Sequence, residues 1–181
     1  TTDIQLISEL DKDVTRLEKI TERFSKIGSK PKLVPEDVNS VIESAVDYLK
    51  TRSSKNITFK IDTSDSPLIV PLNVSLFEWV LENICKNSMD AIDGNGTIHI
   101  SVIDNEKFVF IDITDNGKGI PRSRYKTIFK PGFTTKERGW GLGLSLSKRI
   151  VEEYHGGKIF VASSEISKGT TIRITLNTTE K

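Results

Sequence analysis

The chain of 181 residues carries 26 basic and 25 acidic side chains, a formal net charge of +1. Such a balance offers no field that would attract nucleic acid or an anionic membrane surface, so we expect no nucleic-acid partner. With 36% hydrophobic and 28% charged residues the chain can bury one sizeable core, and its single cysteine, Cys85, excludes an internal disulfide. No apolar run reaches the roughly 20 residues of a spanning helix, so a membrane attachment would come only from other segments of a longer protein, of which this chain looks like a piece.

The first thirty residues have the pattern of a long amphipathic helix. Apolar residues recur in alternating steps of three and four from Ile4 to Ile27, and charged residues fill most of the other positions. Gly28 and Pro31 are typical of a helix end. The narrow apolar stripe favours a seam in a helical bundle, although ordinary core packing gives the same pattern. We therefore predict a first unit over residues 1–29 and a second over 30–181.

Helices and antiparallel strand pairs are grouped together in the second unit. We expect a helix starting at Pro35-Glu36-Asp37 and ending near Leu49, a strand over 57–61, a helix over 73–92, a hairpin of strands over 97–104 and 108–114, a helix over 144–154, and closing strands over 158–163 and 170–176. This grouping predicts an α+β fold, a two-layer α/β sandwich, and not a doubly wound sheet.

Three short polar side chains share one face of the helix expected over 73–92. Asn83 and Asn87 lie about 40° apart around the helix, and Asp90 lies about 60° further round. Exposed asparagines need no function, so a solvated surface explains the cluster equally well when it is taken alone. An amide oxygen is also a hard ligand suited to Mg²⁺, an ion that takes much of its coordination from water and substrate phosphates. The opposite face is expected in the core and consists of Trp79, Val80, Ile84, Met89 and Ile92.

Two glycine-rich segments indicate a nucleotide site. Asp115 ends a predicted strand and leads into Asn116-Gly117-Lys118-Gly119-Ile120, where a carboxylate could accept a hydrogen bond from an exocyclic amine while glycine lets a flat ring approach. Adenine is the natural candidate, although a plain Asn-Gly turn has the same sequence. The second segment, Gly139-Trp140-Gly141-Leu142-Gly143-Leu144-Ser145, precedes a helix whose free amides and dipole favour phosphate oxygens. It lacks both the Gly-Lys-Ser/Thr of a Walker loop and the βαβ frame of a dinucleotide site.

Taken in order, these segments resemble the sequence boxes of sensor histidine kinases. Residues 83–87, 115–119, 129–136, 139–145 and 169–171 are similar to the N box, the first glycine box, the F box, the second glycine box and the final Gly-Thr of that family. The resemblance covers nearly the whole chain, and residues 1–29 look like the second helix of the dimerisation and histidine-phosphotransfer hairpin. It implies the Bergerat fold, ATP and Mg²⁺ as cofactors, and transfer of the γ-phosphoryl group to a histidine and then to a response-regulator aspartate.

The resemblance also implies roles for the polar residues. It makes Asn87 the Mg²⁺ ligand, and Asn83 a support for the metal and the phosphates. Asp115 would read the N6 amine of adenine, helped by a water held near Gly119 and Thr170.

A lid over the nucleotide is implied for residues from about 122 to 140. Phe129 would pack on the base, Lys130 or Lys136 would reach the phosphates, and Gly141 and Gly143 would hinge the lid and present amides to the phosphate tail. Solvated charge explains either lysine as well. The full nucleotide-binding set that the resemblance implies is Asn83, Asn87, Asp115, Gly117, Gly119, Ile120, Phe129, Lys130, Lys136, Gly141, Leu142, Gly143, Leu144 and Thr170.

The position of Asn83 departs from hydrolytic relatives. Members of the superfamily that hydrolyse ATP carry a glutamate base four residues before the metal-binding asparagine, whereas the amide of Asn83 cannot accept a proton at neutral pH. Glu82 lies about 140° from Asn87 around the helix and should face elsewhere. We therefore expect slow hydrolysis of ATP.

Neither histidine resembles a phosphoryl acceptor. His99 lies within a predicted strand, and His155 closes a helix just before Gly156, where a partial positive charge would suit the helix dipole. Structural roles are expected for both. The chain should thus bind Mg-ATP but phosphorylate only a hairpin that is supplied to it.

Partners and alternatives follow from the same resemblance. The implied partners are the receiver domain of a response regulator and a second copy of the parent protein, joined through the hairpin helices. This part of the parent is expected in the cytoplasm, and family habit favours a membrane-anchored parent. A Bergerat-fold ATPase that dimerises on ATP would need the missing glutamate, and an anti-sigma-type serine kinase would leave the leading helix unexplained. A degenerate site is disfavoured because Asn87, Asp115 and Gly141 are all present.

Overall fold

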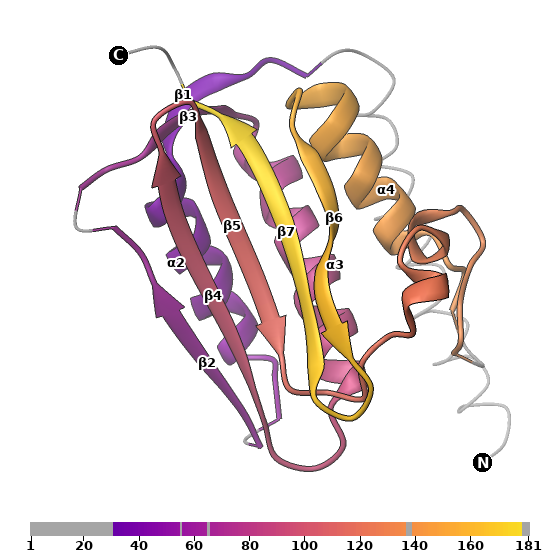
Figure 1. Ribbon diagram of the computed structural model, residues 1–181. Helices are drawn as coiled ribbons and strands as arrows, with labels where there is room; N and C mark the ends of the chain where they lie inside the picture. Colours follow the sequence, from indigo (N-terminus) through magenta and orange to yellow (C-terminus); the bar gives the residue numbers. More distant parts are fainter. Residues whose placement is uncertain (1–30, 55, 65, 137–138, 179–181) are drawn as a thin grey trace, which may run out of the picture. The chain divides into compact units, whose positions relative to one another are not determined.

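The computed structural model describes residues 31–54, 56–64, 66–136 and 139–178, drawn in colour in Figure 1. The chain divides into two compact units, residues 1–32 and 33–181, and nearly all described residues belong to the second. The helix predicted for residues 1–29 lies outside the described residues, so that helix and the boundary after it stay predictions. Within the described part of the chain, no helix has the length and apolar character needed to cross a membrane.

A five-stranded sheet forms one layer of the second unit (Figure 1). Its order is β2 (Ile57–Asp62), β4 (Gly96–Asn105), β5 (Phe108–Asp115), β7 (Gly169–Asn177) and β6 (Lys158–Glu165). The β2–β4 pair is parallel and the other three pairs are antiparallel. Strand residues alternate in burial because successive side chains point to opposite faces, so that Val109, Ile111 and Ile113 of β5 are buried. These residues form the sheet side of the core.

Helices cover one face of this sheet (Figure 1). They are α2 (Val38–Lys50), α3 (Val74–Ala91) and α4 (Gly143–Arg149), the last of which continues as a π-helical turn over Ile150–Tyr154. All six residues predicted for the apolar face of α2 are buried: Val38, Val41, Ile42, Ala45, Val46 and Leu49. The predicted two-layer α+β sandwich is confirmed.

The start of α2 differs from the prediction. Pro35, Glu36 and Asp37 form the strand β1 (Val34–Asp37), which pairs antiparallel with β3 (Ile69–Leu72), a strand that the sequence analysis did not identify. Asp37 still caps the helix, because its Oδ1 accepts the N–H of Asn39 at 3.3 Å. The prolines Pro35 and Pro71 lie opposite each other in the register, so the pair leaves no ladder N–H unused. Four-residue strands with a central proline give too short an alternation to be recognised in a sequence.

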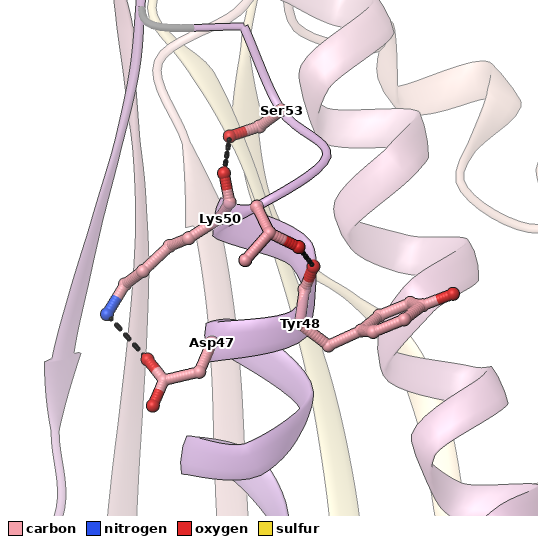
Figure 2. A network of polar contacts seen from close by, with 5 residues as sticks. Asp47, Tyr48, Lys50 and Ser53 are labelled. Carbon is pink, nitrogen blue, oxygen red and sulfur yellow. Dashed lines mark hydrogen bonds and ion pairs between the residues drawn. The ribbon is translucent and has the colours of Figure 1, made fainter.

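The C-terminal end of α2 is capped by side chains that follow it in the sequence (Figure 2). Thr51 donates its hydroxyl to the carbonyl of Tyr48 at 2.7 Å, and Ser53 donates to the carbonyl of Lys50 at 3.2 Å. The Lys50 ammonium pairs with Asp47 at 3.0 Å. The two hydroxyl bonds satisfy carbonyls that the last turn leaves without helical partners.

Candidate functional site

The predicted polar cluster of α3 lies next to a lysine of the predicted lid. The Lys136 ammonium donates to Oδ1 of Asn87 at 3.1 Å and also pairs with the carboxylate of Asp90. Asn87 is half-buried and Asp90 is exposed. The opposite side of the helix is in the core, as predicted for Trp79, Val80 and Ile84, but Met89 and Ile92 are only half-buried because α3 ends near them.

Asn83 points to a different neighbour. Its Nδ2 donates to Oγ of Ser147 at 3.4 Å, and a Cβ added to Gly143 would lie 3.4 Å from its Oδ1. Ser147 is fully buried and donates to the carbonyl of Gly143 at 3.0 Å. Asn83 therefore joins α3 to the second glycine segment.

Asp115 is a buried carboxylate at the end of β5. Its side chain accepts the N–H of Gly117 at 2.9 Å, and further hydrogen bonds come from the hydroxyl of Ser88 and the backbone of Thr170. Burial raises the pKa of Asp115, and these three donors oppose that rise only in part. A carboxylate has about four acceptor positions, so at least one remains for a ligand that donates a hydrogen bond.

The glycines of the first segment are needed mainly for protein packing. Gly119 has φ +73°, and a Cβ there would lie 2.2 Å from the carbonyl oxygen of Glu165. A Cβ on Gly117 would lie 2.6 Å from the carbonyl oxygen of Ala91 at the end of α3. These glycines were expected to admit a flat ring, whereas in the structure they admit the backbone of neighbouring segments.

The loop after Gly119 is held by a serine that the sequence analysis missed. The N–H of Ile120 donates to Oγ of Ser164 at 2.7 Å, and that oxygen lies 2.9 Å from Oγ1 of Thr170. The hydroxyl of Tyr125 donates to the Ser164 carbonyl at 2.9 Å. Ser164 lies near the end of β6 and has no sequence signal of its own, since one strand serine looks like any other.

The predicted lid contains two short 3₁₀ helices, Arg122–Arg124 and Thr127–Phe129. Phe129 is buried, with the Lys148 ammonium 5.9 Å from its ring centroid, while Lys130 is exposed. Lys136, and not Lys130, contacts Asn87.

The base of the lid is closed by backbone contacts. The N–H of Gly132 donates to the Gly141 carbonyl at 3.0 Å. Gly141 has φ +64°, and a Cβ there would lie 2.5 Å from the carbonyl carbon of Gly132. Leu142 and Leu144 are half-buried on either side of Gly143, the first residue of α4. The second glycine segment thus joins the lid to α4.

Both histidines have structural contacts. His155 is buried, its Nε2 accepts the N–H of Asn73 at 3.1 Å, and its Nδ1 donates to the carbonyl of Ile150 at 2.8 Å. Burial lowers the pKa of His155, so the partial positive charge predicted from the helix dipole is wrong. Nε2 of His99 lies 2.6 Å from the Asp62 carboxylate on the neighbouring strand.

Comparison with known proteins identifies the family to which this chain belongs. Residues 73–180 match the family of histidine kinase-, DNA gyrase B-, and HSP90-like ATPases. The chain belongs to this family. It is 30% identical over 174 residues to sporulation kinase D of Bacillus subtilis (strain 168), covering 93% of this chain and 34% of that protein. It is 32% identical over 175 residues to the sensor histidine kinase ZraS of Escherichia coli (strain K12), covering 95% of this chain and 37% of that protein.

Solved structures that resemble this chain are also those of histidine kinases. The catalytic domain of histidine kinase ThkA superposes with a TM-score of 0.74 at 30% identity, covering 82% of this chain and 97% of that domain. ThkA in complex with the response regulator protein TrrA gives a TM-score of 0.75 at 27% identity, over 94% of this chain and 49% of that chain. The resemblance to histidine kinases is confirmed, and the chain is an ATP-binding domain of the histidine kinase type. It spans about a third of the length of the two kinases named above.

Proposed function

We propose that the chain is the ATP-binding catalytic part of a two-component sensor histidine kinase. In this proposal it transfers the γ-phosphoryl group of ATP to a histidine on a hairpin helix, for relay to an aspartate of a response regulator. The observation that carries the proposal concerns two consecutive residues of α3. Asn87 accepts a hydrogen bond from the Lys136 ammonium, and Ser88 donates one to the buried carboxylate of Asp115. A group that could read the base and a group that could bind a cation therefore lie beside consecutive residues of one helix, which suits a magnesium nucleotide. The relatives are sensor kinases, which favours this function over a free-standing ATPase or a serine kinase.

The residues of the polar cluster fit a magnesium ion. The ammonium of Lys136 is a cation held by the amide oxygen of Asn87 and the carboxylate of Asp90, so these oxygen atoms already accommodate a positive charge. Among the described residues, no group of three or more His, Cys, Asp or Glu could hold a metal. An ion bound here would take most of its ligands from water and phosphates, as Mg²⁺ prefers. Asn87 would be its protein ligand, and Mg²⁺ would neutralise charge on the phosphates.

The base and the phosphates would then lie along α3. Asp115 would accept from the N6 amine, with a bridging water near Gly119 and Thr170, and Ile120 would line the same pocket beside Gly117. Phosphoryl transfer in such a site depends mainly on positioning and on exclusion of water.

The lid would supply the remaining contacts. Lys136 would exchange Asn87 for the phosphates, with Lys130 as the second candidate, and Phe129 would support the base. Residues 141–144 would present backbone groups to the phosphate tail, and Asn83 would keep α4 aligned with α3 through Ser147.

Slow hydrolysis of ATP follows from two residues of α3 itself, Asn83 and Glu82. Asn83 occupies the position of the base in hydrolytic relatives, and its amide is used in the contact with Ser147. Glu82 pairs with Lys86 at 2.7 Å. Water is therefore poorly activated, and a histidine is the better nucleophile.

The acceptor and the partners lie in the longer protein that we infer. His155 is buried and His99 pairs with Asp62, so neither suits phosphorylation. The acceptor would come from the hairpin whose second helix is predicted at residues 1–29, through which two copies of the parent would dimerise. A receiver domain as partner is supported by the ThkA complex with its response regulator. We place this part of the protein in the cytoplasm.

A transfer assay tests the proposal. The chain is mixed with Mg²⁺, γ-labelled ATP and the parent's hairpin, with a matched hairpin whose acceptor histidine is replaced by glutamine. We expect acid-labile, base-stable label on the intact hairpin only. Label on serine or threonine, or equal label on both hairpins, would overturn the proposal.

A further inference from the structure

The hydroxyl of Ser164 is the centre of a saturated hydrogen-bond cluster beside the proposed base pocket. Its Oγ lies 2.7 Å from the amide nitrogen of Ile120, 2.9 Å from the carbonyl oxygen of Gly169, and 2.9 Å from Oγ1 of Thr170. We propose that Ser164 determines which purine the site accepts, because it fixes the direction of the Thr170 hydroxyl proton. This inference rests on the proposed function, in which Asp115 reads the base.

The three contacts of Ser164 allow one arrangement of protons. A serine hydroxyl has one proton to donate and two lone pairs that accept. The amide of Ile120 can only donate, and the carbonyl of Gly169 can only accept, so the serine proton goes to Gly169. The proton between Ser164 and Thr170 must then come from Thr170. The reverse arrangement would leave the Ser164 and Gly169 oxygens 2.9 Å apart with no proton between them, which is repulsive.

Thr170 can consequently only accept from a ligand. It is buried, pairs in register with Asp115 across β5 and β7, and its backbone donates to the Asp115 carboxylate. The two side chains are on the helix-covered side of adjacent strands, where cross-strand neighbours come within reach of one ligand group. An ionised carboxylate is likewise an acceptor only. The pocket therefore presents acceptors alone to the group at C6 of a purine.

This polarity selects the amine of adenine against the oxygen of guanine and hypoxanthine. The N6 amine carries two protons, so it can donate to both acceptors directly. The O6 atom of guanine or hypoxanthine has no proton. It would therefore face two hydrogen-bond acceptors and would lose the hydrogen bonds that it makes in water. Sites built to bond a particular donor reject analogues that lack it far more strongly than apolar pockets reject a change of size.

Replacing Ser164 should release the constraint. In Ser164→Ala the Thr170 hydroxyl loses its acceptor and can turn its proton toward O6, so we expect the preference for ATP over GTP and ITP to narrow by about tenfold. Loss of the bond from Ile120 should lower the affinity for all three nucleotides equally. The ratio of the affinities for ATP and for GTP or ITP therefore reports the change in selectivity alone. Ser164→Thr restores the hydroxyl and should restore the ratio.

The test is calorimetric titration of the whole chain with non-hydrolysable ATP, GTP and ITP analogues at saturating Mg²⁺. The matched control is Thr171→Val, which removes a cross-strand hydroxyl bond to Thr114 of 3.0 Å on the next residue of β7 and should leave the ratio unchanged. If Ser164→Ala does not fold, Thr170→Val gives the same readout, because it removes the oriented acceptor and should narrow the ratio.

Two outcomes are distinguishable from each other. A Ser164→Ala or Thr170→Val variant with the wild-type ratio overturns the role of Ser164 and leaves adenine binding intact. A wild-type chain that binds all three nucleotides equally overturns the inferred selection of the purine, and one that binds no adenine nucleotide overturns the proposed function itself.

Discussion

Gly119 should tolerate alanine far less well than Gly94, although both have a left-handed backbone. Gly94 has φ +78° and no atom within 4 Å of an added Cβ, whereas Gly119 has φ +73° and the Glu165 carbonyl oxygen 2.2 Å away. The backbone conformation alone costs alanine about 1–2 kcal/mol, partly offset by a less flexible unfolded chain. Gly94→Ala should therefore lower the free energy of unfolding by about 1 kcal/mol or less.

At Gly119 a steric clash lowers the free energy of unfolding further. Backbone atoms must move apart by about 1 Å to reach ordinary contact distance. Two hydrogen bonds cross this contact, from Ile120 to Ser164 and from the Ser167 N–H to the Lys118 carbonyl at 2.9 Å. Each is worth about 1 kcal/mol, so Gly119→Ala should cost about 3 kcal/mol in total.

Urea unfolding of the two variants against wild type measures the difference, and nucleotide titration should show weaker binding for Gly119→Ala alone. Equal losses of stability at positions 94 and 119 would refute the steric argument and the placement of the loop against β6.

Three further predictions concern the histidine, the cysteine and the turnover of ATP. Because burial lowers the pKa of His155 in the folded state, its contribution to stability should be complete above its ordinary value near 6.5 and be lost as pH falls through the lower folded value. Urea midpoints between pH 8 and 5 should fall less steeply for His155→Phe, and identical slopes would contradict the buried neutral ring. Burial raises the pKa of Cys85 to about 12, so a thiol reagent at pH 8 should label it only after denaturation, and rapid labelling of the folded chain would disprove its burial. The chain alone should hydrolyse fewer than about one ATP per second in a coupled assay, since no glutamate stands at position 83, and turnover of many ATP per second would contradict that reasoning.

The sequence predicted the parts of the fold that have long periodic patterns. The apolar face of α2 and the hairpin of β4 and β5 follow from patterns that extend over 13, 10 and 8 residues, so neighbouring structure changes them little. β1 and β3 could not be predicted, because each has four residues and a proline, and their pairing joins segments more than thirty residues apart. His155 was placed correctly at a helix end, but its charge depends on burial against α3, which no local pattern contains.

In the candidate site too, residues within sequence motifs could be predicted and residues outside them could not. Asn87 and Asp115 stand in motifs, so the resemblance named them, and the structure adds their contacts with Lys136 and Ser88. Ser88 and Ser164 could not be found, since their importance comes from hydroxyl contacts across the fold and not from their neighbours in sequence. Gly117 and Gly119 were expected to leave room for a ligand, whereas in the structure they leave room for neighbouring backbone, and their contact with a nucleotide stays a prediction.

Titration of the whole chain with a non-hydrolysable ATP analogue, with and without Mg²⁺, tests the central claim most directly. Wild type should bind the analogue, and Mg²⁺ should tighten the complex. Asp115→Asn keeps the shape of the side chain but replaces an acceptor by a donor, so affinity should fall about 100-fold. Asn87→Ala should abolish most of the gain from Mg²⁺. If Asp115→Asn holds the analogue as tightly as wild type, or Mg²⁺ tightens Asn87→Ala as much as wild type, the account of this site is contradicted.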